Sequence, residues 1–235
     1  MTATDVLAEL KQLGTAQTRK TWLNHGAPDT CLGVLIGDLK KIQKRVKKDH
    51  DLALALYDTG ISEAMYLAGL IADDARMTKA ELKRWVKQAN WSMISDFTVP
   101  WVAAGSPHGR ELAMEWIDAK SESVAAAGWA TYSSLVSISD DADLDLEELK
   151  TLLARVQKTI HGAPNRVRYQ MNNFVICVGS YVKPLTELAI KTAEKIGVVH
   201  VDMGNTACKV PEAVAYIQKV KERGSLGKKR KTAKC

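Results

Sequence analysis

The stretch Thr78-Lys-Ala-Glu-Leu-Lys-Arg-Trp-Val-Lys-Gln88 decides the fold class. Thr78 and Glu81 have the spacing of a capping box, in which the threonine oxygen and the glutamate carboxylate each accept an orphan backbone N–H group at a helix start. Leu82 and Trp85 follow at a helical spacing and mark one apolar face. The stretch therefore predicts an amphipathic helix that buries one face.

Similar start and stop signals recur every 12 to 20 residues, and strand signals are scarce. Trp85-Val86 and Trp116-Ile117 lie 31 residues apart, each after a Glu-Leu pair. Short turns make neighbouring helices antiparallel, and a repeat of this length is typical of stacked helix pairs. We expect an all-α fold, an α-solenoid (superhelix) of about six HEAT-like antiparallel helix pairs with a concave basic face.

The charge is unevenly distributed along the chain. Residues 219–235 carry eight basic residues and one acidic residue, whereas the remainder is close to neutral. We therefore expect a single HEAT-like domain over residues 1–224 and a basic, disordered tail over residues 225–235. Segment 198–210 lacks helical periodicity and predicts a short extended loop or a hairpin.

Several functional classes are excluded by what the sequence lacks. The four cysteines form no C-x-x-C pair, which argues against a zinc site and is typical of a reducing compartment. There is no P-loop, Rossmann fingerprint or nucleophile elbow. No apolar run is long enough for a membrane span, and the first 13 residues have no signal core. We expect a cytoplasmic monomer, nucleoid-associated if bacterial, with no metal.

Two groups of cations are candidates for binding nucleic acid. Six lie on one predicted helix with a buried face opposite, and like charges this close favour an anionic partner such as a phosphate backbone: Lys40, Lys41, Lys44, Arg45, Lys47 and Lys48. A second group in the tail can follow phosphates electrostatically: Lys228, Lys229, Arg230 and Lys231. The alternative for both groups is a solvated surface.

Two further groups of polar residues lie at positions of predicted helices where their presence needs a specific reason. Asp96 lies on an otherwise apolar helix that also carries Trp91, so it either caps or pairs with a neighbour, or faces a cleft. Arg166 and Arg168 lie in the first turn of a predicted helix, where the helix dipole disfavours cations, and Asn172 follows them. These three residues predict contacts with phosphates or sugars, or else ion pairs between helices.

Several segments resemble the DNA alkylation repair (AlkD-like) glycosylases. They are Cys31-Leu-Gly-Val34 followed by Asp38-Leu-Lys-Lys-Ile42, Trp91 with Asp96-Phe-Thr-Val-Pro100, and residues 111–127; residues 202–211 look like a divergent branch. The resemblance extends over roughly residues 5–220. It implies a HEAT-repeat hydrolase that holds double-stranded DNA, including alkylated DNA, and removes N3- or N7-alkylpurines with neither a metal nor an organic cofactor.

The resemblance also implies roles for individual residues. Asp96 takes the position of the carboxylate that stabilises positive charge developing on the sugar, and Trp91 that of a lesion-contacting tryptophan. Other family positions differ: Ser92 stands where a second tryptophan is expected, Ala126 where an arginine is expected, and residues 174–178 contain no tryptophan. Three functions therefore stay open: a glycosylase, a non-catalytic DNA-structure binder, and a protein-interaction scaffold.

Overall fold

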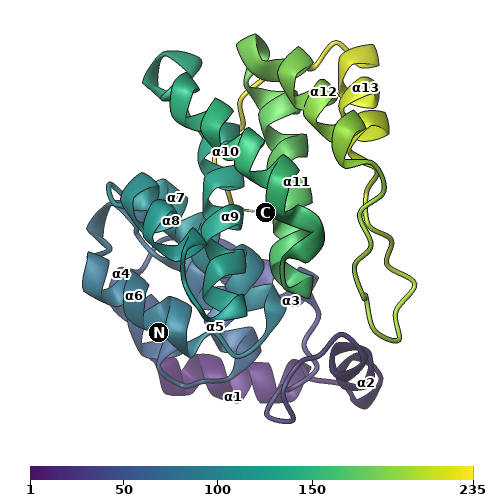
Figure 1. The fold of residues 1–235 in the computed structure, drawn as a ribbon. Helices are drawn as coiled ribbons and strands as arrows, with labels where there is room; N and C mark the ends of the chain where they lie inside the picture. The colour runs from purple at the N-terminus through teal and green to yellow at the C-terminus, as the bar shows by residue number, and fades with distance from the viewer. Residues whose placement is uncertain (235) are drawn as a thin grey trace. The chain divides into compact units, whose positions relative to one another are not determined.

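The computed structural model describes residues 1–234, which contain thirteen α-helices and no strand (Figure 1). The all-α class predicted from the sequence is confirmed. The expected capping box is present, since Thr78 Oγ1 accepts from Glu81 N at 3.2 Å and the Glu81 carboxylate accepts from Thr78 N at 2.8 Å. Contacts group the described residues into two compact units, residues 1–108 with 204–207 and 234, and residues 109–203 with 208–233.

The first unit is built around one helix that is buried on every side. All ten residues of α5 (Ser62–Ile71) are buried, and α5 packs against α1, α3, α4, α7 and the π-helix Ile94–Thr98. The remaining helices of this unit are α1 (Ala3–Leu13), α2 (Ala16–Asn24), α3 (Ile36–Val46), α4 (His50–Tyr57), α6 (Lys79–Gln88) and α7 (Val99–Gly105). Tyr57 of α4 stacks on Trp85 of α6 with ring centroids 4.0 Å apart and donates its hydroxyl to the Trp85 carbonyl at 2.7 Å.

The second unit has two long central helices, α9 (Glu122–Ile138) and α11 (Asn165–Tyr181), which pack against each other. Trp129 of α9 meets Phe174 of α11 edge-on, with centroids 5.2 Å apart. Gly128 lets α8 approach α9, because a Cβ there would lie 2.5 Å from Ile117 N. The flanking helices are α8 (Gly109–Ile117), α10 (Leu146–Thr159), α12 (Thr186–Ile196) and α13 (Ala213–Glu222).

Two segments are not simple α-helices. Residues Ile94–Thr98 form a π-helix that runs directly into α7, where Pro100 lies in the first turn and needs no N–H partner. Segment 198–210 contains neither a helix nor a strand, so the extended-loop alternative describes it. Within residues 1–234, no helix combines the length and apolar character that crossing a bilayer requires.

The described part of the tail, residues 225–234, makes hydrogen bonds to helix ends; residue 235 lies outside the described range. In the second unit, Gly227 N donates to the Ser180 carbonyl at the end of α11, and Arg230 N donates to the Ser137 carbonyl at the end of α9. Composition alone could not reveal this docking, because the partner carbonyls belong to distant parts of the chain.

Candidate nucleic-acid interface

Helix α3 has one buried and one cationic face, as its periodicity predicted. Leu39 and Ile42 are fully buried against the core of the first unit. Four cations lie on the helix, with Lys40 half-buried and Lys41, Lys44 and Arg45 exposed. The helix ends at Val46, one residue earlier than six cations on one helix would require, so exposed Lys47 is its C-cap residue with a φ of 62° and exposed Lys48 lies beyond the helix.

Half of these cations have carboxylate partners. Lys41 pairs with Asp38 at 2.8 Å, Lys48 pairs with Asp73 at 3.2 Å, and Arg45 pairs with Glu9 of α1. Among the described residues, the other three have no carboxylate within ion-pair distance: Lys40, Lys44 and Lys47. No ion pair within residues 1–234 compensates these three charges, so this region attracts anions.

The start of α3 is held by a buried glutamate that the sequence reading did not single out. Glu63 of α5 accepts hydrogen bonds from three successive backbone N–H groups, those of Leu32, Gly33 and Val34, at 2.7 to 3.3 Å. Trp22 Nε1 donates to the Val34 carbonyl at 3.0 Å. The signal that could have revealed this contact is an acid inside the apolar run of α5, because a buried carboxylate requires donors.

Gly33 makes this tight loop possible. Its φ is +80°, and a Cβ at this position would lie 2.5 Å from the Thr15 carbonyl oxygen and 2.6 Å from Arg19 N. The Arg19 side chain closes the other side, donating to the carbonyls of Cys31 at 3.1 Å and Asp29 at 2.6 Å. The loop that precedes α3 is therefore held in place, and it fixes the position of the basic helix on the first unit.

Trp91 and Asp96 lie in the first unit but are largely buried. Asp96 is 2% exposed and accepts a hydrogen bond from Ser95 Oγ at 2.8 Å. Trp91 is 7% exposed, donates Nε1 to the His25 carbonyl at 2.8 Å, and packs against Trp22 with centroids 5.6 Å apart. A carboxylate or an indole that contacts a nucleotide has to be reachable, and these two side chains are enclosed by the fold.

The polar residues of α11, in the second unit, bind the loop that precedes α13. Asn172 is buried and donates to the Pro211 carbonyl at 2.9 Å. Arg168 donates to the carbonyls of His200 at 2.7 Å and Ala163 at 3.1 Å. The Arg166 guanidinium lies 4.8 Å from the centre of the Tyr169 ring. Asn172 and Arg168 thus bind the backbone at Pro211 and His200 within the second unit, and neither contact is an ion pair between helices.

The four tail cations fall into two groups. Lys228, Arg230 and Lys231 are exposed. The Lys229 side chain is only 15% exposed, because its ammonium pairs with Asp141 at 2.8 Å and donates to the Val136 carbonyl at 2.9 Å. Lys229 is therefore engaged within the second unit and is less exposed than Lys228, Arg230 and Lys231.

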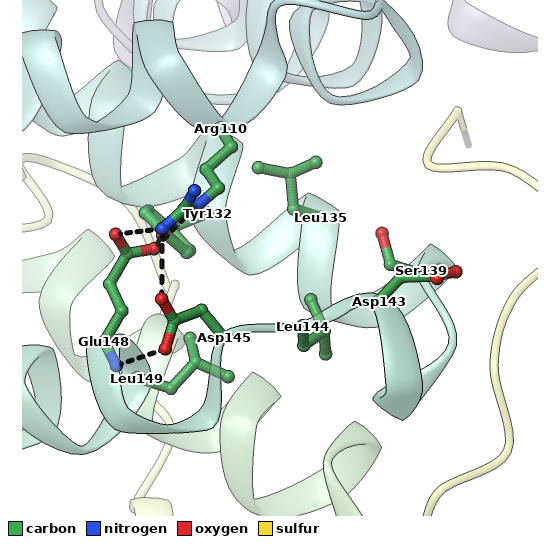
Figure 2. A pocket seen from close by; sticks show the side chains of 9 residues that line it. All are labelled: Arg110, Tyr132, Leu135, Ser139, Asp143, Leu144, Asp145, Glu148 and Leu149. Atoms are coloured by element: carbon green, nitrogen blue, oxygen red, sulfur yellow. Dashed lines mark hydrogen bonds and ion pairs between the residues drawn. The ribbon is translucent and has the colours of Figure 1, made fainter.

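A small pocket in the second unit is chemically unsuited to DNA (Figure 2). Arg110 is bound there by two carboxylates, Glu148 at 2.8 Å and Asp145 at 3.2 Å, and Tyr132 donates its hydroxyl to Glu148. The hydrogen bonds that Arg110 donates to the Glu148 carboxylate raise the pKa of Arg110. With Asp143 also lining it, the pocket carries more negative than positive charge and repels phosphate.

Comparisons with known proteins agree with this architecture. The family described as DNA alkylation repair enzyme matches residues 6–217. Uncharacterized proteins of Listeria monocytogenes and Listeria innocua are 36% and 35% identical to this chain, and each alignment covers 92% of this chain and 95% of the relative. A solved structure with 35% sequence identity superposes over 100% of both chains with a TM-score of 0.91.

That solved structure is described as representing a new family of proteins related to the HEAT-like repeat DNA glycosylases, with affinity for branched DNA structures. The similarity confirms the helical-repeat class that the spacing of the helix signals predicted. The family match spans nearly all of the described helices. This chain therefore belongs to the DNA alkylation repair enzyme family and has its HEAT-like repeat fold.

Proposed function

We propose that this protein binds the phosphate backbone of structured, branched DNA and does not excise bases. The observation that carries the proposal is a group of lysines at α3: Lys40 and Lys44 on the helix and Lys47 at its C-cap have no carboxylate partner among the described residues. Lysines placed in this way release condensed counterions when they meet phosphates, which drives binding without reading base sequence.

The rigid base of α3 favours this role. Glu63 and Gly33 fix the loop that leads into the helix, so the cations need little ordering when DNA binds. The exposed tail cations Lys228, Arg230 and Lys231 are further candidates for phosphate contacts. Arg166 is a candidate in the second unit.

The preference for branched DNA rests on the related solved structure, whose family has affinity for such structures. At 35% identity over both whole chains, the two proteins have closely similar backbones on which to place cations. A branched DNA offers phosphates from several duplex arms, so a protein with separate cationic regions gains more from it than from one linear duplex.

The absence of base excision is proposed because the residues that would perform it are enclosed or replaced. Asp96 is 2% exposed, and Trp91 uses its indole N–H within the fold. Ala126, where the family resemblance places an arginine, is fully buried in α9. A cationic base would therefore find neither an accessible carboxylate nor the expected aromatic and cationic partners.

The binding test compares linear duplex, three-way and four-way junctions of the same total length, by fluorescence anisotropy at several salt concentrations. Replacing Lys40, Lys44 and Lys47 by glutamine should weaken binding to each DNA and reduce the slope of log K against log salt by about 2.7, near 0.9 for each lost contact. A control with the same charge change replaces three exposed lysines elsewhere: Lys158, Lys191 and Lys195. An equal loss in both triple variants would contradict a specific role for α3.

The alternative function is a glycosylase that uses Asp96, whose place on a π-helix is a feature found often at functional sites. It is tested by release of free base from duplex DNA that contains N7-methylguanine or N3-methyladenine, with wild type beside Asp96→Asn. We expect no release by either protein. Release by wild type that falls at least tenfold in the variant would overturn the proposal and would identify Asp96 as the catalytic carboxylate.

A further inference from the structure

Two turns of the chain have nearly the same sequence and the same structure. Residues 71–75 read Ile-Ala-Asp-Asp-Ala and residues 138–142 read Ile-Ser-Asp-Asp-Ala, 67 positions later. The first follows α5 and the second follows α9, and each contains a short 3-10 helix, Asp74–Arg76 and Asp141–Asp143. Each turn also ends in a residue that caps the next helix, Thr78 for α6 and Asp145 for α10.

The second aspartate of each turn forms an ion pair with a lysine of the tail. In the second unit, Asp141 Oδ1 lies 2.8 Å from Lys229 Nζ. In the first unit, Asp74 Oδ1 lies 2.7 Å from Lys234 Nζ. The two lysine side chains are only 15% and 13% exposed, so both ammonium groups are largely removed from water.

Each ammonium also donates to a carbonyl at the end of the preceding helix. Lys229 Nζ donates to the Val136 carbonyl of α9 at 2.9 Å, and Lys234 Nζ donates to the Ala72 carbonyl at the end of α5 at 2.9 Å. The last carbonyls of a helix have no partner within it and carry the negative end of the helix dipole. A lysine ammonium has three N–H donors, so it can pair with the carboxylate and donate a hydrogen bond to a carbonyl at the same time.

The first turn is shaped to hold its aspartate. A Cβ on Gly105 would lie 2.5 Å from Asp74 Oδ2, so only glycine leaves room for the carboxylate at the end of α7. Burial raises the pKa of Asp74, and the Lys234 charge opposes that shift. A carboxylate placed here is costly unless a cation accompanies it.

We propose that the Ile-x-Asp-Asp-Ala turn is a binding site for a primary ammonium group, built twice into this chain, and that the chain's own Lys229 and Lys234 are its resident ligands. Within the first unit Lys234 completes the end of α5, and within the second unit Lys229 completes the end of α9. These two half-buried lysines serve the fold, while Lys228 and Lys231 remain exposed.

The test uses the full-length protein without DNA, so its failure and the failure of the proposed DNA binding are distinguishable. Backbone amide hydrogen exchange is followed by mass spectrometry in peptides covering residues 226–234. In wild type we expect exchange at least tenfold slower than in an unstructured peptide of the same sequence. Lys229→Met should remove most of this protection, whereas Lys231→Met, which deletes an equal charge from the same segment, should leave it unchanged.

The partner variants complete the test. Asp141→Asn should raise exchange in the tail as much as Lys229→Met does, and the double variant should add nothing further because both changes break one contact. Lys234→Met should raise exchange in residues 71–78 of the first turn. Exchange in α11, residues 165–178, serves as a check that each variant is folded. Wild-type tail amides exchanging at the unstructured rate, or equal effects of Lys229→Met and Lys231→Met, would overturn the proposal.

Discussion

Replacing Glu63 by glutamine is expected to lower the free energy of unfolding by about 3 kcal/mol. The wild-type carboxylate accepts from three backbone N–H groups, and hydrogen bonds to a charged group contribute about 1.5–3 kcal/mol each. Glutamine keeps one carbonyl oxygen for some of these donors but loses the charge. Leu32 N–H then keeps one of its two acceptor oxygens, while the glutamine amide group, itself a donor, faces it in place of the other.

The change is measured by urea unfolding at pH 7, followed by tryptophan fluorescence, and by calorimetry. For a chain of this size, a loss of about 3 kcal/mol corresponds to a fall in Tm of roughly 6–12 °C. The control is Glu194→Gln, an isosteric change at an exposed position of α12, which should stay within about 0.5 kcal/mol of wild type. If Glu63→Gln were equally neutral, the carboxylate would not be what holds the loop before α3, and the reasoning would fail.

Three other predictions concern single positions. Gly33→Ala should destabilise the protein by about 1–3 kcal/mol more than Gly26→Ala in urea unfolding, because both glycines have a φ of +80° but only Gly33 is crowded by backbone. Lys47→Gly should raise the Tm, since Lys47 has a φ of 62°, and should reduce the salt slope of DNA binding by about 0.9, two effects that calorimetry and anisotropy separate. At pH 8, iodoacetamide labelling followed by mass spectrometry should find exposed Cys208 modified long before Cys177, whose pKa burial raises to about 12; comparable rates would contradict that burial.

The parts of the fold that depend on neighbouring residues were predictable. The capping box at Thr78 and the buried face of α3 are set by spacings of three and four residues, so the sequence alone indicated them. The cations on the opposite face of α3 followed from the same periodicity. These features need no knowledge of what the helix packs against.

The parts that depend on distant partners were not predictable in the same way. Asn172 looked like an external contact but donates to the Pro211 carbonyl, and Lys229 looked like a solvated tail residue but pairs with Asp141. Composition gives a residue's charge and polarity but not the location of an acceptor many positions away. The repeated Asp-Asp-Ala turns can be read in the sequence, but only the structure identifies the lysines that pair with them.

The capping of α5 by Lys234 also has a consequence for the order of events during protein synthesis. The Ala72 carbonyl accepts from a side chain 162 positions later in the chain. At about 5–20 residues per second, a ribosome needs roughly 8–30 s to make that stretch. Throughout this interval the end of α5 must rely on water, so the nascent first unit acquires its last hydrogen bond only after the second unit has been translated.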